Sequence, residues 1–72
     1  MIISDENKAF LEKEIENFQE LFDKNDIDEI LSELNFFLTS SKCLDDEYYP
    51  TPYGDKAQRI YDEILYDNYE NE

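Results

Sequence analysis

Apolar residues recur in three separate stretches of the chain at the spacing of one face of an α-helix. In the first stretch the apolar positions are four, three and four residues apart, with two neighbours that widen the stripe: Leu11, Ile15, Phe18 and Phe22, with Phe10 and Leu21. This spacing places all of these side chains on one side of a helix. Ser4 precedes the stretch, and a serine oxygen accepts a hydrogen bond from a free amide at a helix start. We therefore predict a first helix over residues 5–23.

The second stretch begins with a capping box headed by Asp26, a pattern that satisfies two unpaired amides at a helix start. Its apolar face is continuous: Ile27, Ile30, Leu31, Leu34, Phe37 and Leu38. These features predict a helix over residues 27–39. Phe36 lies off this face, on the side shared with Asp28 and Asn35. It is either an isolated surface aromatic, which is common in proteins, or a contact residue for a partner.

Thr51 and Pro52 indicate the start of a further helix, because proline lacks an amide hydrogen and is favoured in the first turn. The apolar stripe that follows predicts a helix over residues 52–67: Ala57, Ile60, Tyr61, Ile64 and Leu65. Between the helices, the acidic stretch 45–49 is long enough for only one helical turn. We predict an all-α fold, a small antiparallel bundle of three main helices plus one short helical turn, in a single domain over residues 1–72.

The charge of the chain indicates what kind of partner it has. Twenty acidic residues against six basic residues give a formal net charge of −14, while 40% of the residues are hydrophobic and eleven are tyrosine or phenylalanine. This apolar content predicts a folded chain and not a disordered acidic tail. Such a charge weakens a compact fold, attracts basic surfaces, and repels nucleic acids and anionic membranes. We therefore expect a basic protein partner that itself binds nucleic acid, and no direct contact with nucleic acid or membrane.

The composition also limits the chemistry that this chain performs. With no histidine there is no imidazole base, no Ser–His or Cys–His pair and no histidine zinc site. Cys43 is the single cysteine, so no internal disulfide forms, and a lone thiol suits a reducing cytoplasm. A calcium loop near residue 26 is not supported, because Leu34 stands where the bidentate glutamate belongs. We predict no enzyme activity, no cofactor and no metal site, and, with neither signal peptide nor membrane span, a cytoplasmic location.

One acidic and aromatic segment is the strongest candidate for binding a partner. Its candidate contact residues are Asp45, Asp46, Glu47, Tyr48 and Tyr49, with Tyr53 nearby. Tyrosine is favoured in interfaces because it buries a large rigid ring and still offers a hydroxyl. Carboxylates beside it can accept hydrogen bonds from arginine or lysine. Alternatively, a tyrosine fills the bundle while the acids are solvated, and we expect this for at least one of Tyr48 and Tyr49 but not for both.

The segment Asp45-Asp46-Glu47-Tyr48-Tyr49-Pro50, followed by Thr51-Pro52-Tyr53-Gly54, resembles the colicin- and pyocin-type nuclease immunity proteins. Those are acidic four-helix bundles whose short third helix carries Asp-x-x-Tyr-Tyr-Pro and whose last helix begins with Ser-Pro-x-Gly. The apolar positions of residues 27–34 fall where the family places those of its second helix. Asp46 and Glu47 depart from the pattern, since the family has apolar residues there.

The resemblance implies a function and a set of binding residues. In that family the third-helix aspartate and tyrosines are the shared binding anchors, which implies this role for Asp45, Tyr48 and Tyr49. The exposed side of the second helix selects the partner, which implies a selecting surface made of four residues: Asp28, Ser32, Asn35 and Phe36. The expected function is that of a bacterial immunity protein that binds and neutralises a basic nuclease toxin.

Two other functions fit the same composition. A phage-encoded nucleic-acid mimic, such as an anti-CRISPR or anti-restriction protein, would place carboxylates like phosphates in a DNA channel. Its binding would weaken steeply with salt and depend a little on many acids. A small adaptor subunit would use its acidity only for solubility. An immunity protein differs from both, because its binding depends strongly on a few aromatic residues.

Overall fold

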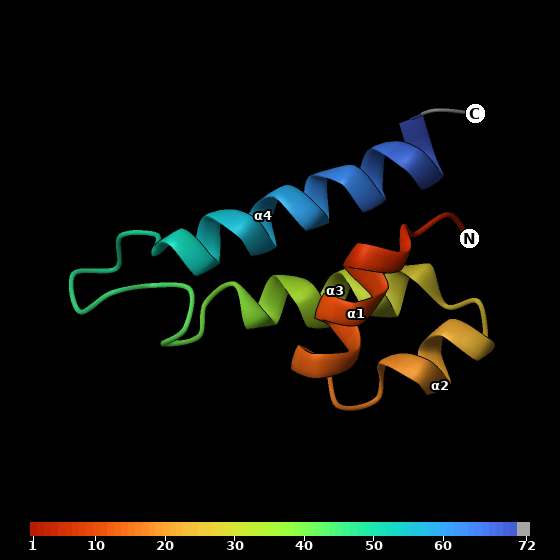
Figure 1. Ribbon diagram of the computed structural model, residues 1–72, viewed down its shortest axis with the longest axis horizontal. Helices are drawn as coiled ribbons and strands as arrows, with labels where there is room; N and C mark the ends of the chain where they lie inside the picture. Colours follow the sequence, from red (N-terminus) through yellow and green to blue (C-terminus); the bar gives the residue numbers. More distant parts are fainter. Residues whose placement is uncertain (71–72) are drawn as a thin grey trace.

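The computed structural model describes residues 1–70 and consists of four α-helices followed by one π-helical turn. The elements are α1 (Asp5–Glu14), α2 (Phe18–Asp23), α3 (Ile27–Phe37), α4 (Pro52–Leu65) and η1 (Tyr66–Glu70). No strand forms within these residues, and the predicted all-α fold is confirmed. Helices α3 and α4 run antiparallel side by side, and α1 crosses this pair steeply in Figure 1. Residues 71–72, the end of the predicted domain, lie outside the described residues.

The predicted helix over 5–23 is wrong as a single element, because the chain leaves the helix at Ile15. Ile15 has extended backbone angles, φ −113° and ψ 110°, and α2 begins only at Phe18. A straight helix over the whole range would be about 28 Å long. That exceeds the two shorter extents of the molecule, 25 Å and 19 Å. The break lets the chain turn, so that Ile15 and Phe18 are both buried on either side of it.

The end of α2 and the start of α3 share one tightly bonded junction. Asn25 adopts a left-handed φ of 56°, a conformation that asparagine tolerates. Its amide donates to the carbonyl of Phe22, and the amide of Asp26 donates to the carbonyl of Leu21. The carboxylate of Asp26 accepts from the amide of Glu29 at 3.3 Å. The amide of Asp26 is therefore already occupied by α2, and only this half of the predicted capping box forms.

The predicted helical turn over 45–49 is wrong, because this segment forms a tight non-helical turn. Leu44 and Pro50 pair as an isolated antiparallel bridge that closes the turn. Helix α3 ends at Phe37, earlier than the predicted residue 39, and the following amides bond back to form turns. We call residues 44–50 the tyrosine turn.

Helix α4 starts as predicted and is held close to the tyrosine turn. The hydroxyl of Thr51 accepts from the amide of Gly54 at 3.0 Å and donates to the carbonyl of Lys42 at 2.6 Å. The amide of Thr51 donates to the carbonyl of Cys43 at 2.8 Å. A Cβ atom on Gly54 would overlap that same Cys43 carbonyl. Only glycine at this position lets the backbone before the turn lie directly against α4.

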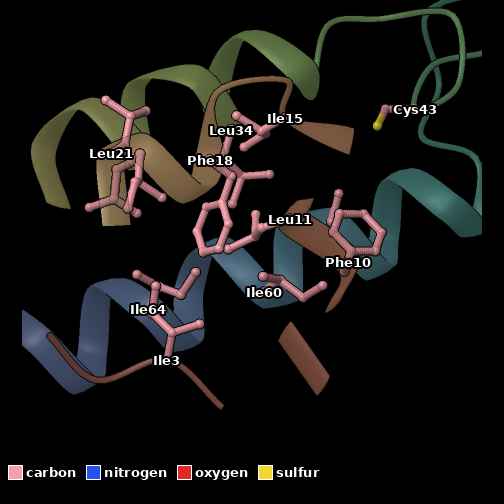
Figure 2. Packing of buried hydrophobic residues seen from close by; sticks show 13 residues of the cluster. Ile3, Phe10, Leu11, Ile15, Phe18, Leu21, Leu34, Cys43, Ile60 and Ile64 are labelled. Carbon is pink, nitrogen blue, oxygen red and sulfur yellow. The ribbon is translucent and has the colours of Figure 1, made fainter. Parts of the chain in front are cut away.

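The core lies between α1, α2, α3 and α4, as Figure 2 shows. The buried apolar residues come from all three predicted stripes, from the segment before α1 and from the loop before the tyrosine turn: Ile3, Phe10, Leu11, Ile15, Phe18, Leu21, Ile30, Leu31, Leu34, Cys43, Ala57, Ile60 and Ile64. Cys43 is among the most deeply buried of them, and burial raises the pKa of its thiol. A buried thiol with a raised pKa is a packing residue rather than a nucleophile.

The two ends of the described chain are fastened together by side chains. Helix α4 continues past the predicted residue 67 as the π-helical turn η1. Within η1, the side chain of Asn68 accepts from the amide of Ile2 at 2.7 Å and donates to the Ile2 carbonyl at 2.9 Å. The hydroxyl of Tyr69 donates to the carboxylate of Asp28, at the start of α3. We call this group of contacts the terminal clasp.

Candidate interaction surface

The tyrosine turn is built around the side chain of Asp45. One carboxylate oxygen of Asp45 accepts from the amides of Glu47 at 2.8 Å and of Tyr49 at 3.0 Å. The Asp45 amide donates to the carbonyl of Tyr49, and the Asp45 carbonyl accepts from the amide of Tyr48, both at 2.9 Å. Aspartate stabilises turns in this way, by bonding to amides a few residues ahead. Asp45 therefore holds the two tyrosines in place, while Asp46 and Glu47 are exposed at the tip.

Both tyrosines of the turn point into solvent. The exposed fractions are 81% for Tyr48 and 64% for Tyr49. The expectation that at least one of them fills the bundle is wrong. Tyr48 also has a left-handed φ of 66°, which is uncommon for a bulky side chain and raises the energy of the fold. The turn thus holds a large ring in solvent in a backbone conformation that suits glycine better.

Tyr53 takes the inward position that was expected of Tyr48 or Tyr49. Its ring lies 5.3 Å from that of Phe10 and 6.3 Å from that of Phe37, measured between centroids. Its hydroxyl donates to the carboxylate of Glu14 at 2.8 Å. The structure therefore places Tyr53 in the packing behind the turn, and its hydroxyl has a partner within the chain.

Glu14 is a buried carboxylate with two partners. Its side chain is only 3% exposed, and Lys42 pairs with it at 3.1 Å on the solvent side. Burial acts to raise the pKa of Glu14, but the hydrogen bonds from Tyr53 and Lys42 outweigh it and lower this pKa. Burial and the adjoining Glu14 carboxylate raise the pKa of Tyr53 to about 12. The pair is a hydrogen bond between a charged acceptor and a neutral donor, with little access to water.

The four residues of the predicted selecting surface are all exposed, and their spacing places them along one side of α3: Asp28, Ser32, Asn35 and Phe36. Asp28 lies at the start of α3 and accepts the hydroxyl of Tyr69 in the terminal clasp. Phe36 lies in the last turn of α3, next to the loop that leads to the tyrosine turn. The structure thus associates Phe36 with the tyrosine turn and Asp28 with the opposite end.

Phe36 forms part of a groove that the sequence did not reveal. The groove has a volume of about 600 Å³ and lies between the corner after α1 and the end of α3, lined by Glu14, Ile15, Glu16, Asn17, Glu33, Phe36, Phe37 and Ser40. A smaller hollow of about 300 Å³ lies beneath the tyrosine turn, and Ser40 lines both. The predicted unbroken helix over 5–23 would have had no corner here, so only the exposed Phe36 could have indicated this groove. We call it the corner groove.

Most of the negative charge has no basic partner within the described residues. Two lysines, Lys24 and Lys42, form ion pairs there. Two others, Lys8 and Lys56, lie over the rings of Phe22 and Phe10. With twenty acidic and six basic residues in the sequence, this leaves an excess of exposed carboxylates. The surface can therefore attract a cationic macromolecule.

Over residues 1–70, no three cysteine, aspartate or glutamate side chains come together as metal ligands. None of the described helices combines the length and the apolar character needed to cross a membrane. The sequence matches no protein-family model, and neither the curated proteins nor the solved structures contain a significant match to it. The resemblance to nuclease immunity proteins therefore stays a prediction from the residues of the tyrosine turn.

Proposed function

We propose that this chain is an acidic protein inhibitor that binds and neutralises a basic nuclease, as a bacterial immunity protein does for its toxin. The observation that carries the proposal is the tyrosine turn, in which Asp45 holds Tyr48 and Tyr49 in solvent beside free carboxylates. Exposed tyrosines on a fixed backbone are the side chains that most often dominate protein interfaces. A turn that is already ordered before binding loses little conformational entropy in the complex.

The charge and the aromatic residues have separate tasks in this proposal. The net charge of −14 speeds the encounter with a basic nuclease, because opposite charges steer association. Once bound, the rings of Tyr48 and Tyr49 are buried and slow dissociation. An acidic protein beside the nuclease active site would also repel the nucleic-acid substrate. Such an inhibitor acts in the cytoplasm, where the free thiol of Cys43 stays reduced.

The proposal is tested with the purified chain and a basic nuclease domain from the source strain, sought by pull-down and in the reading frame next to the gene. Equimolar inhibitor is expected to abolish cleavage of nucleic acid, and binding is measured by titration calorimetry. Tyr48→Ala and Tyr49→Ala are each expected to cost about 2 kcal/mol of binding free energy. Tyr66→Ala is the matched control, because Tyr66 is also an exposed tyrosine, 53% exposed, but lies in η1. Equal losses for all three variants would contradict a role for the tyrosine turn.

Salt dependence separates the inhibitor from a nucleic-acid mimic. Raising the salt from about 150 mM to about 500 mM screens the steering charges but leaves the buried tyrosine contacts in place. We expect the dissociation rate to change little and the association rate to fall. A mimic would instead lose most of its affinity and would compete directly with DNA. That result would replace the proposed function with the mimic.

A further inference from the structure

The corner groove has the features of a site for a cationic side chain, and the first is an unpartnered aromatic wall. Phe36 is 78% exposed, although it is one of the largest apolar side chains of α3. With Ile15 and Phe37 it forms the apolar part of the groove lining. A single exposed ring is common on protein surfaces, but this one lies beside a groove and is therefore open to contact with another molecule. A flat aromatic face suits the guanidinium group of arginine, which stacks on such rings.

The second feature is a set of carboxylates that have no ion pair. Glu16 and Glu33 line the groove on opposite sides, from the corner after α1 and from α3, and neither is in the ion pairs of the described residues. Glu14 also lines the groove, but Lys42 and Tyr53 already bind its carboxylate. The two free carboxylates can therefore pair with a cation that enters the groove.

The third feature is the direction of the two helices that end here. Helix α1 ends at Glu14 and helix α3 at Phe37, so the groove lies at the carbonyl ends of both helices. The carbonyl end of a helix carries partial negative charge and favours cations. The last turn of α3 contains no basic residue of its own. Helix α2 begins at the same corner with its N-cap Asn17 in the lining, and Lys13 lies in the last turn of α1, so the preference for a cation depends mainly on Glu16 and Glu33.

The corner groove and the hollow under the tyrosine turn are neighbours that share one lining residue. Ser40 lines both, and the second hollow is lined on its far side by Asp45, Asp46 and Tyr48. Each of the two neighbouring hollows is thus lined by an exposed aromatic ring and by carboxylates. A single segment of a partner can contact both.

We propose that this surface binds one cationic segment of the partner, with an arginine stacked on Phe36 between Glu16 and Glu33. A second basic side chain of the same segment reaches Asp46 beside Tyr48. This inference rests on the proposed function, since it names the chemistry that the acidic inhibitor recognises. The inference adds the corner after α1 to the contact surface. Asp28, at the other end of α3, is not part of that surface.

A capped oligo-arginine peptide tests the inference directly at about 150 mM NaCl, where long-range attraction is largely screened. Titrated into the full chain labelled with ¹⁵N, it is expected to shift the backbone amides of residues 14–17, 33–40 and 45–48. Phe36→Ala is expected to lower the affinity for the peptide about tenfold, and Glu33→Gln about threefold. The matched controls are Tyr66→Ala and Glu12→Gln, an exposed aromatic and an exposed acid outside the groove, which are expected to leave the affinity unchanged. Thermal unfolding of each variant checks that it is folded.

Shifts spread over the whole acidic surface, or equal losses for Glu33→Gln and Glu12→Gln, would overturn the groove as a specific site. The nuclease complex then distinguishes this failure from failure of the proposed function. If Tyr49→Ala weakens nuclease binding but Phe36→Ala does not, the inhibitor function stands and the groove inference is wrong. If the groove binds the peptide while no basic nuclease binds the chain, the groove stands and the proposed function is wrong.

Discussion

The two ends of the long axis both carry exposed tyrosines, but the contacts that hold them differ. At one end, Tyr48 and Tyr49 are fixed through their own backbone, which bonds to the backbone and the carboxylate of Asp45. At the other end, Tyr69 is fixed through its hydroxyl, which donates to Asp28 in the terminal clasp. Figure 1 shows these ends on opposite sides of the molecule.

This difference indicates which end is suited to binding. A tyrosine whose hydroxyl already has a partner must give up that hydrogen bond before it can bond to another molecule. A tyrosine held by its backbone keeps its whole side chain available. We therefore interpret the terminal clasp as a contact that stabilises the fold and the tyrosine turn as the surface that binds a partner. Five substitutions test this comparison.

Gly54→Ala has the largest expected effect, because Gly54 allows the backbone at Cys43, just before the tyrosine turn, to pack directly against α4. The new Cβ would overlap the Cys43 carbonyl, so the turn must move away from the helix. We expect a loss of about 3 kcal/mol in the free energy of unfolding, measured by urea denaturation. Alanine is the better helix former, so a loss of this sign opposes helix propensity. Gln58→Ala, on the exposed side of α4, is the control and should change stability by less than about 0.5 kcal/mol. A stable Gly54→Ala protein with unchanged nuclease binding would show that the close contact between Gly54 and Cys43 is not needed.

Tyr53→Phe tests the packing behind the turn. Removal of the hydroxyl leaves the buried Glu14 carboxylate with Lys42 as its remaining side-chain partner. We expect a loss of about 2 kcal/mol in the free energy of unfolding, since a hydrogen bond to a buried charge is lost. The absorbance of tyrosinate should show a titration near pH 12 in the parent chain that is missing from the variant. If that titration persists in Tyr53→Phe, another tyrosine is its source.

The same pair gives the stability a pH dependence at both extremes. The pKa of Tyr53 is raised from 10.0 to about 12 in the folded chain, so its contribution is present below pH 10 and is lost as the pH rises toward 12. The pKa of Glu14 is lowered from 4.5, so its contribution is present above pH 4.5 and is lost as the pH falls below that value. Tyr53→Phe should flatten the alkaline loss relative to the parent chain.

Asp45→Ala and Asn68→Ala compare the two ends directly. Asp45 accepts two backbone amides in the tyrosine turn, and Asn68 makes two backbone hydrogen bonds to Ile2 in the terminal clasp. Each substitution should lower the free energy of unfolding by about 1.5 kcal/mol. Only Asp45→Ala is expected to weaken nuclease binding, because only its turn presents the contact tyrosines. Equal weakening by both variants would remove the distinction between the two ends.

Tyr48→Gly has the smallest expected effect on stability and the opposite sign. Glycine adopts the left-handed φ of residue 48 without strain, so the fold should gain about 0.5 kcal/mol after the entropy of the unfolded chain is included. Nuclease binding should weaken, because the exposed ring is lost. Differential scanning calorimetry and binding titration on the same sample measure both effects. A variant that is less stable than the parent chain would mean that the ring supports the turn.

Some elements of the structure could be predicted from the sequence and others could not. The apolar stripes predicted the helical class and most of the core, because a helix that buries one face repeats its apolar residues every three to four positions. The start of α4 was predicted at Thr51, whose hydroxyl accepts the Gly54 amide. These features depend on neighbours within one turn, and the sequence contains all of the information about them.

The break at Ile15 and the shape of the tyrosine turn could not be predicted in the same way. The stripe through Ile15 and Phe18 fits an unbroken helix equally well, and the extended backbone of Ile15 appears only in the folded chain. The acidic segment before Pro50 also fits a helical turn. The bonds of Asp45 and the bridge between Leu44 and Pro50 decide against it. The corner groove exists because the chain breaks at Ile15, so the groove could not be predicted from the sequence either.

The sequence alone determined that this is a strongly acidic helical chain with a cluster of carboxylates and tyrosines before its last helix, because charge and periodicity are properties of the residues themselves. Only the tertiary structure decided that Tyr53 points inward while Tyr48 and Tyr49 point outward, and that Phe36 lines the corner groove while Asp28 contacts Tyr69 in the terminal clasp. Those choices depend on how distant segments share one small core, where Gly54 meets Cys43 and Tyr53 meets Glu14.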